Sequence, residues 1–261
     1  MTVKSIIVAS DLSERSRQAV RRGVNLAAGL EARLTVLHVV DAAIPAALAT
    51  QIQKEAVKSL ADDVAEDAKG RQIDHEIKVV IGDTIEEING TAQTASADLL
   101  IVGLHRRRVF LDHIKETTME HLIRSSNLPV LLVSEEADHD YARVLGGVDL
   151  SPVCASALHK IQVIAPKAKV DLFHAHQVSF RKEAERDYAT WKAVCGLPDH
   201  LPEPIFVEAS AQDALHDLMA KERYDLLAIG AHTRSNTGRY ILGGFSAGLI
   251  RQPPCDLLLA K

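Results

Sequence analysis

Cysteines, aromatic residues and long apolar runs are all scarce in this sequence of 261 residues. The cysteines (Cys154, Cys195 and Cys255) lie far apart and outside any CxxC spacing, which argues against a disulfide framework or a zinc knuckle. No apolar stretch approaches the roughly 20 residues that a helix needs to cross a bilayer, so we expect no membrane partner. The chain opens on a strand-like segment instead of a signal peptide, and we therefore expect a cytoplasmic protein.

Neither acidic nor basic residues are in large excess. The chain has 30 basic and 35 acidic residues, a formal net charge of -5 and no long basic tract, so we expect no nucleic-acid partner. Aromatic residues make up 4% of the chain although 47% of it is hydrophobic, which means that the cores must be aliphatic. The length is about twice that of a common domain of roughly 100–150 residues, and it predicts two domains.

The second half of the chain repeats the first. The segment "ADLLIVGLHRR" (97–107) aligns with "YDLLAIGAHTR" (224–234), which pairs Asp98 with Asp225 at a shift of 225 − 98 = 127 residues. The same shift, without a gap, aligns "HLIRSSNLPVLLV" with "GLIRQPPCDLLLA". A shift shared by two separate blocks indicates an internal repeat.

Two upstream blocks repeat in the same order, and they align two aspartates and two histidines: Asp11 with Asp149, and His38 with His174. Four blocks in one order, with unequal gaps between them, indicate a duplicated domain. We predict domains at 1–137 and 142–261, with the charged stretch "SEEADHDYA" as the linker between them.

Each copy alternates short apolar strands with helices. Runs such as "SIIVAS", "RLTVLHVV" and "DLLIVG" are apolar throughout, as strands covered on both faces are. Residues 13–30 between the first two place small apolar residues at helical spacing opposite arginines. The alternation predicts an α/β fold with two tandem, doubly wound parallel sheets of the Rossmann-like kind. Ligands of such sheets bind beyond the carboxyl ends of the strands, near a switch in strand order.

Two places in each copy meet that condition. The first is the aspartate that ends the first strand, Asp11 or Asp149, which either caps the following helix or contacts a ligand. The second follows the fourth strand, where Gly230 ends the strand and Gly243 and Gly244 precede a helix at "FSAGLIR". Glycines there let the backbone approach a phosphate group while helix amides point at it. A glycine-rich turn without a ligand is the alternative.

These blocks resemble the universal stress protein family in its tandem form, over nearly the whole chain. The resemblance implies an adenine-nucleotide alpha-hydrolase-like fold and a role in the stress response. Nucleotide-binding members carry Gly-x2-Gly-x9-Gly-Ser/Thr after the fourth strand and contact adenine through the aspartate after the first. The ligand it implies is ATP or another adenine nucleotide, with Mg²⁺ as the only accompanying metal. Because members pair through their last strand, it also implies a pseudo-symmetric pair of domains, with a homodimer left open.

The second copy matches this motif in part. Gly230 and Gly243 occupy the first and third glycine positions, whereas Thr233 and Gly244 stand where the second glycine and the final hydroxyl residue belong. Thr233 adds a side chain but also a hydroxyl, and Ser246 is the candidate to replace the lost hydroxyl contact. The nucleotide-binding residues that the resemblance implies are Asp149, Ala175, Gly230, Thr233, Gly243, Gly244 and Ser246.

The first copy departs further from the motif. Gly103 matches, but Arg106, Glu116 and Thr117 occupy the other three positions. Glu116 would place a carboxylate against an anionic ligand, so we do not expect triphosphate binding there. The run Arg106–Arg108 either holds a different anion or is a solvated charge run. Asp11, Gly103 and Arg106 are the counterparts of the second-copy site, and we expect the first copy to be a degenerate, structural or regulatory partner.

The resulting hypothesis is a binding switch, not an efficient enzyme. The motifs GxSxG and GxxxxGK[ST] are absent, which leaves at most slow ATP hydrolysis. A nucleotide against Asp149 would order residues 231–242 and change the surface offered to a regulatory protein. The alternative is a protein that binds no nucleotide and works through protein partners or another small ligand. His174 and His176, two apart on a strand, are weak candidates for metal ligands, against a packing or hydrogen-bonding role.

Overall fold

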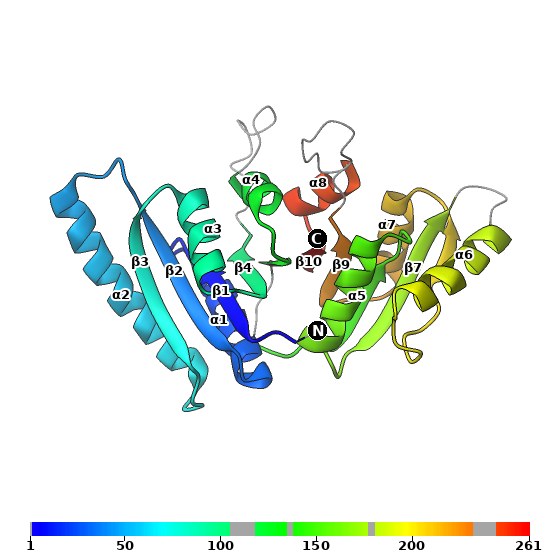
Figure 1. Ribbon diagram of the computed structural model, residues 1–261, viewed down its shortest axis with the longest axis horizontal. Coiled ribbons are helices and arrows are strands. Elements are labelled where there is room, and N and C mark those ends of the chain that lie inside the picture. The colour runs from blue at the N-terminus through cyan, green and yellow to red at the C-terminus, as the bar shows by residue number, and fades with distance from the viewer. Residues whose placement is uncertain (1, 105–117, 135–137, 177–180, 232–243) are drawn as a thin grey trace. The chain divides into compact units, whose positions relative to one another are not determined.

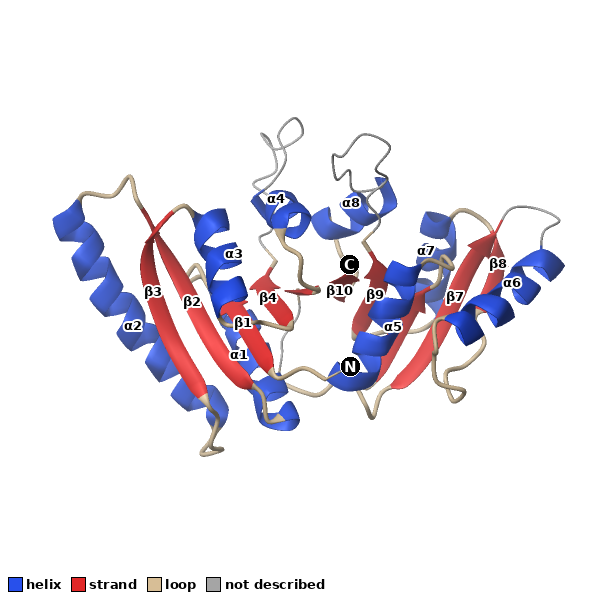
Figure 2. Cartoon of the chain, viewed as in Figure 1, coloured by secondary structure: helices blue, strands red, loops and turns tan. Residues whose placement is uncertain are grey.

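The computed structural model describes residues 2–104, 118–134, 138–176, 181–231 and 244–261. These residues form two compact units, Thr2–Asp140 and Tyr141–Lys261. Strands alternate with helices along both units (Figures 1 and 2). The predicted α/β fold with two tandem parallel sheets is confirmed.

The sheet of the first unit has the strand order β3-β2-β1-β4-β5, with parallel neighbours throughout its described part. Its strands are β1 (Ser5–Ala9), β2 (Arg33–Asp41), β3 (His75–Gly82), β4 (Leu99–Gly103) and β5 (Val130–Val133). Its helices are α1 (Glu14–Leu30), α2 (Ala46–Ala68), α3 (Thr84–Thr94) and α4 (Thr118–Ser125). Because crossovers between parallel strands are right-handed, α1 and α2 cover one face and α3 and α4 the other.

The second unit repeats this topology. Its strands are β6 (Arg143–Gly147), β7 (Lys169–His176), β8 (Ile205–Glu208), β9 (Leu226–Gly230) and β10 (Asp256–Ala260). Its helices are α5 (Pro152–Ile164), α6 (Arg181–Val194), α7 (Ala211–Lys221) and α8 (Gly244–Arg251). The order β8-β7-β6-β9-β10, with parallel pairs, corresponds strand for strand to that of the first unit.

Aliphatic strands form the core of each unit. Every residue of β5, β9 and β10 is buried, as is the centre of β1. These are the continuous apolar runs of the sequence, and helices on both faces of each sheet exclude water from them. The side chains that fill the core are almost all Val, Leu, Ile and Ala, as the low aromatic content predicts.

The aspartates that the repeat aligns have the same structural role in both units. One carboxylate oxygen of Asp98 accepts hydrogen bonds from the backbone amides of Lys4 (2.7 Å) and Ser5 (3.1 Å). The corresponding oxygen of Asp225 accepts from the amides of Ala142 and Arg143, both at 2.8 Å. Each aspartate therefore anchors the start of the first strand of its unit. This position is at the amino-terminal edge of the sheet, opposite to the edge where ligands bind.

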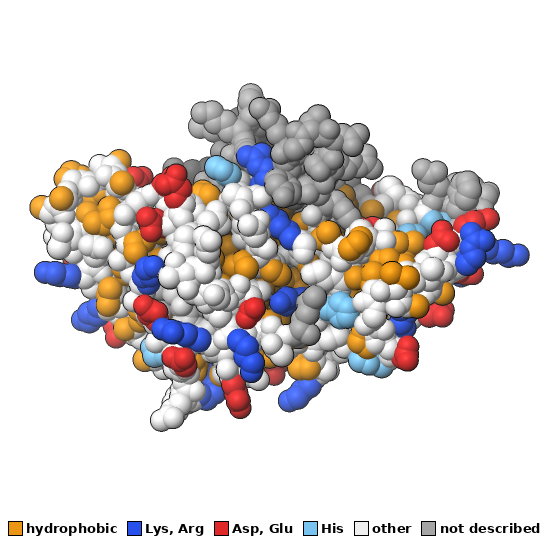
Figure 3. All heavy atoms as spheres, in the orientation of Figure 1, with side chains coloured by type: hydrophobic (Ala, Val, Ile, Leu, Met, Phe, Trp, Pro, Cys, Tyr) orange, Lys and Arg blue, Asp and Glu red, His pale blue; other side chains and the backbone are white. Residues whose placement is uncertain are grey.

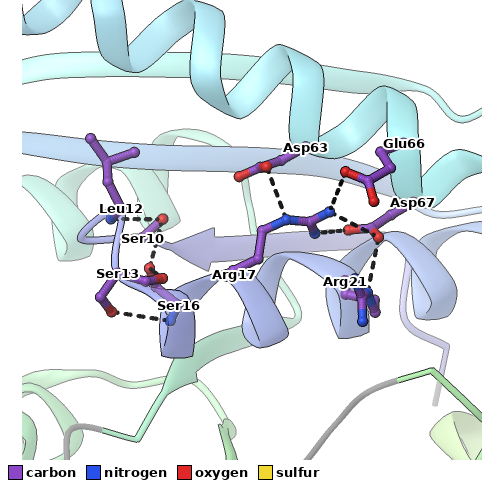
Figure 4. A network of polar contacts seen from close by, with 9 residues as sticks. All are labelled: Ser10, Leu12, Ser13, Ser16, Arg17, Arg21, Asp63, Glu66 and Asp67. Carbon is purple, nitrogen blue, oxygen red and sulfur yellow. Dashed lines mark hydrogen bonds and ion pairs between the residues drawn. The ribbon is translucent and has the colours of Figure 1, made fainter.

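An ionic network joins α1 to α2 in the first unit (Figure 4). The guanidinium of Arg17 pairs with Asp63 (2.9 Å), Glu66 (3.3 Å) and Asp67. Arg21 adds a second contact to Asp67 at 3.0 Å. Because Asp67 is only 3% exposed, its charge depends on these two guanidinium groups for compensation.

We expect Asp67→Ala to lower the free energy of unfolding by about 3 kcal/mol, because it leaves two guanidinium groups at a buried site without their shared partner. Urea unfolding followed by circular dichroism measures this. The control is Asp62→Ala, which removes an exposed carboxylate from the same helix and should change stability by no more than about 0.5 kcal/mol. Equal effects of the two substitutions would show that the network does not stabilise the first unit.

Candidate functional site

The strand order of the second unit reverses between β6 and β9, which are neighbours in the sheet. Their register pairs Gly146 with Ala228, so Asp149 and Gly230 follow at the same edge of the sheet, just beyond the paired segment. Parallel α/β sheets bind ligands at such a switch point. Two residues that the sequence singled out from distant segments therefore lie at the same edge of the sheet, where a ligand is expected.

The turn between β6 and α5 presents Asp149 on the surface. A carboxylate oxygen of Asp149 accepts a hydrogen bond from the amide of Ser151 at 3.0 Å. Ser151 itself caps α5, since its hydroxyl accepts from the amide of Cys154 at 3.0 Å. The helix cap is thus the serine and not the aspartate, and the carboxylate of Asp149 lies at the exposed edge ahead of the helix.

The same turn occurs in the first unit. Asp11 accepts from the amide of Ser13 at 3.0 Å, and Ser13 caps α1. The residue between them is a leucine in both units, with φ 63° at Leu12 and φ 61° at Leu150. A bulky residue rarely adopts this left-handed conformation, which costs roughly 1–2 kcal/mol. Strain of this kind persists where the position of a neighbouring group matters, and here the neighbour is the aspartate.

Three serines support the turn in the first unit (Figure 4). The hydroxyl of Ser10 donates to the hydroxyl of Ser16 (3.0 Å) and accepts from the amide of Leu12 (3.2 Å). The hydroxyl of Ser16 donates in turn to the carbonyl of Ser13 at 2.9 Å. The second unit has an apolar valine and a cysteine, Val148 and Cys154, in place of Ser10 and Ser16.

Burial, together with the negative charge of Asp149, raises the pKa of the Cys154 thiol to about 12. The thiol donates a hydrogen bond to the carbonyl of Gly147 at 3.1 Å. It is therefore protonated at neutral pH and cannot act as a nucleophile. Cys154 has a packing role at the base of the turn.

The aligned histidines hold neighbouring strands together. His174 Nδ1 lies 2.9 Å from the carbonyl of Val148, and His38 Nδ1 lies 2.8 Å from the carbonyl of Ser10. The ring of His174 also packs edge to face against Phe206, with centroids 5.8 Å apart. His176 is buried. Within the described part of the chain no three His, Cys, Asp or Glu side chains are grouped as metal ligands.

Helix packing alone requires a glycine at the first position of the motif, even if no ligand binds. A Cβ atom on Gly230 would lie 2.8 Å from the backbone nitrogen of Cys154 and 3.1 Å from the carbonyl carbon of Val153. A Cβ atom on Gly103 would lie 2.6 Å from the carbonyl oxygen of Arg15. In both units the first turn of the helix therefore sits directly on the end of the fourth strand. Only glycine leaves room for this contact, whether or not a phosphate binds nearby.

The other predicted residues of the second copy are divided between described and undescribed segments. Ala175 is half-buried on β7 and pairs with Val207 of β8. Gly244 begins α8 and is exposed, and among the described residues no atom lies within 4 Å of the place a Cβ would take. Ser246 is buried in the first turn of α8. The remaining candidates lie outside the described residues: Thr233 and Gly243 in the second copy, and Arg106, Glu116 and Thr117 in the first.

Trp191 is a residue of this edge that the repeat could not indicate. Its indole Nε1 donates a hydrogen bond to the carbonyl of Ser151 at 3.1 Å, so the ring of this α6 residue packs on the turn that carries Asp149. The side chain is 8% exposed and is the only tryptophan of the chain. Trp191 lies on α6, and only the folded chain brings that helix against the turn.

Basic and acidic side chains are interspersed among the described residues on the face drawn in Figure 3. None of the helices in the described segments is both apolar enough and long enough to span a bilayer.

A model of the universal stress protein family matches residues 2–134 and 181–261. The chain belongs to the universal stress protein family. The Bacillus subtilis (strain 168) stress response protein NhaX is 28% identical to it over 160 residues, which cover 49% of this chain and 96% of NhaX.

Two solved structures share the fold over the full length of this universal stress protein. A universal stress protein from Archaeoglobus fulgidus DSM 4304 superposes with a TM-score of 0.80 at 18% identity, covering 100% of this chain and 99% of that one. A functionally unknown protein from Pseudomonas aeruginosa PAO1 gives a TM-score of 0.69 at 18% identity, with coverage of 99% and 92%. The tandem arrangement is therefore found in other proteins at low sequence identity.

We expect Gly230→Ala to destabilise the protein by at least about 2 kcal/mol, because the added methyl group meets the backbone of α5 and the helix has to move. Gly90→Ala is the matched control in α3, where the new methyl group has open space and helix propensity should raise stability by about 0.5–1 kcal/mol. Urea unfolding of both variants measures the difference. A neutral Gly230→Ala would mean that packing does not require this glycine.

Alkylation distinguishes the three thiols. We expect iodoacetamide at pH 8 to modify the half-exposed Cys195 in the native protein and to spare Cys154 and Cys255, which are buried. Because the pKa of Cys154 is about 12, its thiolate fraction at pH 8 is negligible. Peptide mass spectrometry locates the label, and labelling of all three thiols in urea is the control. Native labelling of Cys154 at the rate of Cys195 would contradict the buried, protonated state.

Proposed function

We propose that this universal stress protein is a cytoplasmic binding protein of the stress response and that its second unit binds an adenine nucleotide. The observation that carries the proposal is the meeting of Asp149 and Gly230 at the switch point of the second sheet, with Asp149 exposed on a strained turn. The three free thiols suit a reducing compartment.

The roles of the described residues follow from their chemistry. The carboxylate of Asp149 can accept hydrogen bonds from an amino or hydroxyl group of the adenosine part. The first amides of α8 are donors for phosphate oxygens, and Gly244 leaves the backbone open to them. The hydroxyl of Ser246 lies in the same helical turn. A bound nucleotide would add negative charge to this edge of the second unit. The nucleotide and its Mg²⁺ would together form a new surface that a regulatory protein partner could contact.

The proposal is one of binding and not of efficient catalysis. The thiol nearest to the turn, Cys154, is protonated and packed against Gly147. One oxygen of Asp149 accepts from the amide of Ser151, which orients the carboxylate, and the histidine of this region, His174, contacts a backbone carbonyl. Groups held in this way position a ligand but supply neither a nucleophile nor a free base. At most we expect slow hydrolysis of bound ATP.

The second unit is the better candidate because the two units differ after their fourth strands and not in their aspartate turns. Both turns have the same hydrogen bond and the same left-handed leucine. In sequence, however, the first copy places Arg106 and Glu116 where the second has Thr233 and Gly243. A carboxylate at that place disfavours a polyphosphate.

One observation favours a second candidate function, in which no nucleotide binds. Gly103 and Gly230 are both explained by helix packing, so their presence does not require phosphate binding in either unit. A protein of this kind would act through protein partners or another small ligand.

Calorimetry with ATP and Mg²⁺ tests the proposal on the full chain. We expect one site per chain, with affinity reduced at least tenfold by Asp149→Ala and unchanged by the matched substitution Asp11→Ala. Mass spectrometry of small molecules released from the freshly purified protein complements it. The absence of both ATP uptake and released nucleotide would overturn the proposal. An equal loss of ATP affinity in Asp149→Ala and Asp11→Ala would also overturn it, because the second unit would then not be distinguished from the first.

Gly244→Glu separates phosphate binding from folding. The glutamate has open space and lies at a helix start, where a carboxylate stabilises the helix, so stability should not fall. The same charge should abolish ATP binding, whereas the neutral Gly244→Gln should retain it. Trp191 provides the optical signal, since it packs on the Asp149 turn. Unchanged affinity in Gly244→Glu would exclude the start of α8 from the site.

A further inference from the structure

A cleft of about 420 Å³ lies in the second unit between α6 and the chain that leads from it into β8. Its volume is in the range of small-molecule sites, roughly 300–1,000 Å³. None of the residues proposed for the nucleotide lines it. The residues that give it chemical character are two aromatic rings, three carboxylates and one amine: Tyr188, Phe206, Glu185, Asp199, Glu203 and Lys192.

Helix α6 carries two sets of side chains on adjacent parts of its surface. Glu185, Tyr188 and Lys192 follow one another at helical spacing and face the cleft. Trp191 points instead to the turn of Ser151, where its indole donates to the carbonyl. The helix therefore forms one wall of the cleft and at the same time contacts the turn that carries Asp149.

The opposite wall is held to α6 by three hydrogen bonds. The hydroxyl of Tyr188 donates to the carbonyl of Pro202 at 3.2 Å. The amine of Lys192 donates to the carbonyls of Asp199 (3.3 Å) and Leu201 (3.1 Å). These contacts fix the segment after α6 and make the cleft a preformed feature. They also occupy the amine of Lys192, so its charge is directed at backbone carbonyls.

The floor of the cleft is aromatic. Tyr188 is 3% exposed, and its ring meets that of Phe206 edge to face with centroids 6.3 Å apart. Burial raises the pKa of the Tyr188 hydroxyl, and the negative charge of Glu203 raises it further. The phenol is therefore neutral, and it lies close enough to Glu203 to be affected by that carboxylate. The ring of Phe206 is half-buried and is the more accessible of the two, and aromatic faces attract cations.

The charge around this floor is negative. Glu185, Asp199 and Glu203 are exposed at the cleft, against the single positive charge of Lys192. Glu185 is partly compensated by Arg181 at 2.9 Å, while the other two carboxylates border the segment after the helix. Such a lining disfavours a nucleotide or another anion and favours an ammonium group.

We infer that this cleft binds a small organic cation, an aliphatic amine whose carbon chain lies against Tyr188 and Phe206 and whose ammonium groups contact Glu203 and Asp199. The site lies on the side of α6 next to Trp191, and none of the residues that line it belongs to the proposed nucleotide site. An occupant would change the surroundings of Tyr188, whose ring centroid is 5.9 Å from that of Trp191.

Calorimetry of the full-length protein with 1,4-diaminobutane, without nucleotide, tests the inference. We expect one site per chain and an affinity that falls as salt rises, because the attraction is between charges. The uncharged 1,4-butanediol should not bind. Trp191 fluorescence should shift on adding the diamine, because its neighbour Tyr188 lines the cleft. No saturable binding of the diamine at millimolar concentration, or equal binding of the diol, would overturn the inference.

A matched pair of substitutions locates the site. Glu203→Gln removes one carboxylate of the cleft and should weaken diamine binding at least fivefold. Glu183→Gln makes the same change on α6 at an exposed position outside the cleft and should leave binding unchanged. Equal losses would indicate general attraction to a negative surface and would refute the site. Asp149→Ala should bind the diamine normally, which separates this result from the test of nucleotide binding.

Discussion

The close contact between the fourth strand and the first turn of the first helix organises both units. Parallel strands need helical crossovers, and in both units the helix after the first strand also packs on the neighbouring fourth strand. At Gly103 and Gly230 this approach leaves no space for a side chain. The contact sets the position of the helix start, and the helix start sets the aspartate turn that precedes it.

This packing constraint separates two roles that a glycine motif combines, support of the fold and contact with a ligand. One glycine of the motif supports the scaffold in both units, whatever the ligand. The group that can contact a ligand is the aspartate, which a left-handed leucine and a serine amide hold at the exposed edge. The two units share the hydrogen bond and the left-handed leucine of this turn, and they differ in the side chains that support it and in the sequence after their fourth strands.

The units differ in how their first two helices are joined. In the first unit, Arg17 and Arg21 meet the buried Asp67 in an ionic network. In the second unit, a hydrogen bond from the indole of Trp191 joins α6 to the start of α5. Another aromatic residue of α6, Tyr188, lines a cleft. Duplication thus kept the sheet and the turn and allowed the surrounding helices to acquire different contacts.

The sequence by itself determined the duplication, the α/β class and the places where ligand groups should be sought. Apolar strand runs, helical spacing and a shared shift between blocks are local or linear signals. Burial of the strands is the physical cause of the apolar runs. Asp149 and Gly230 were found in this way because one follows a strand and the other ends one. The tertiary structure alone decided that Ser151 and not Asp149 caps the helix, that His174 bonds a backbone carbonyl, and that packing requires Gly230. It also decided that Trp191 of α6 meets the turn while its neighbour Tyr188 lines a cleft. The cap is a local contact whose choice depends on the backbone path of the turn. The other features depend on distances between residues far apart in the chain, and such distances exist only after the helices have packed on the sheet.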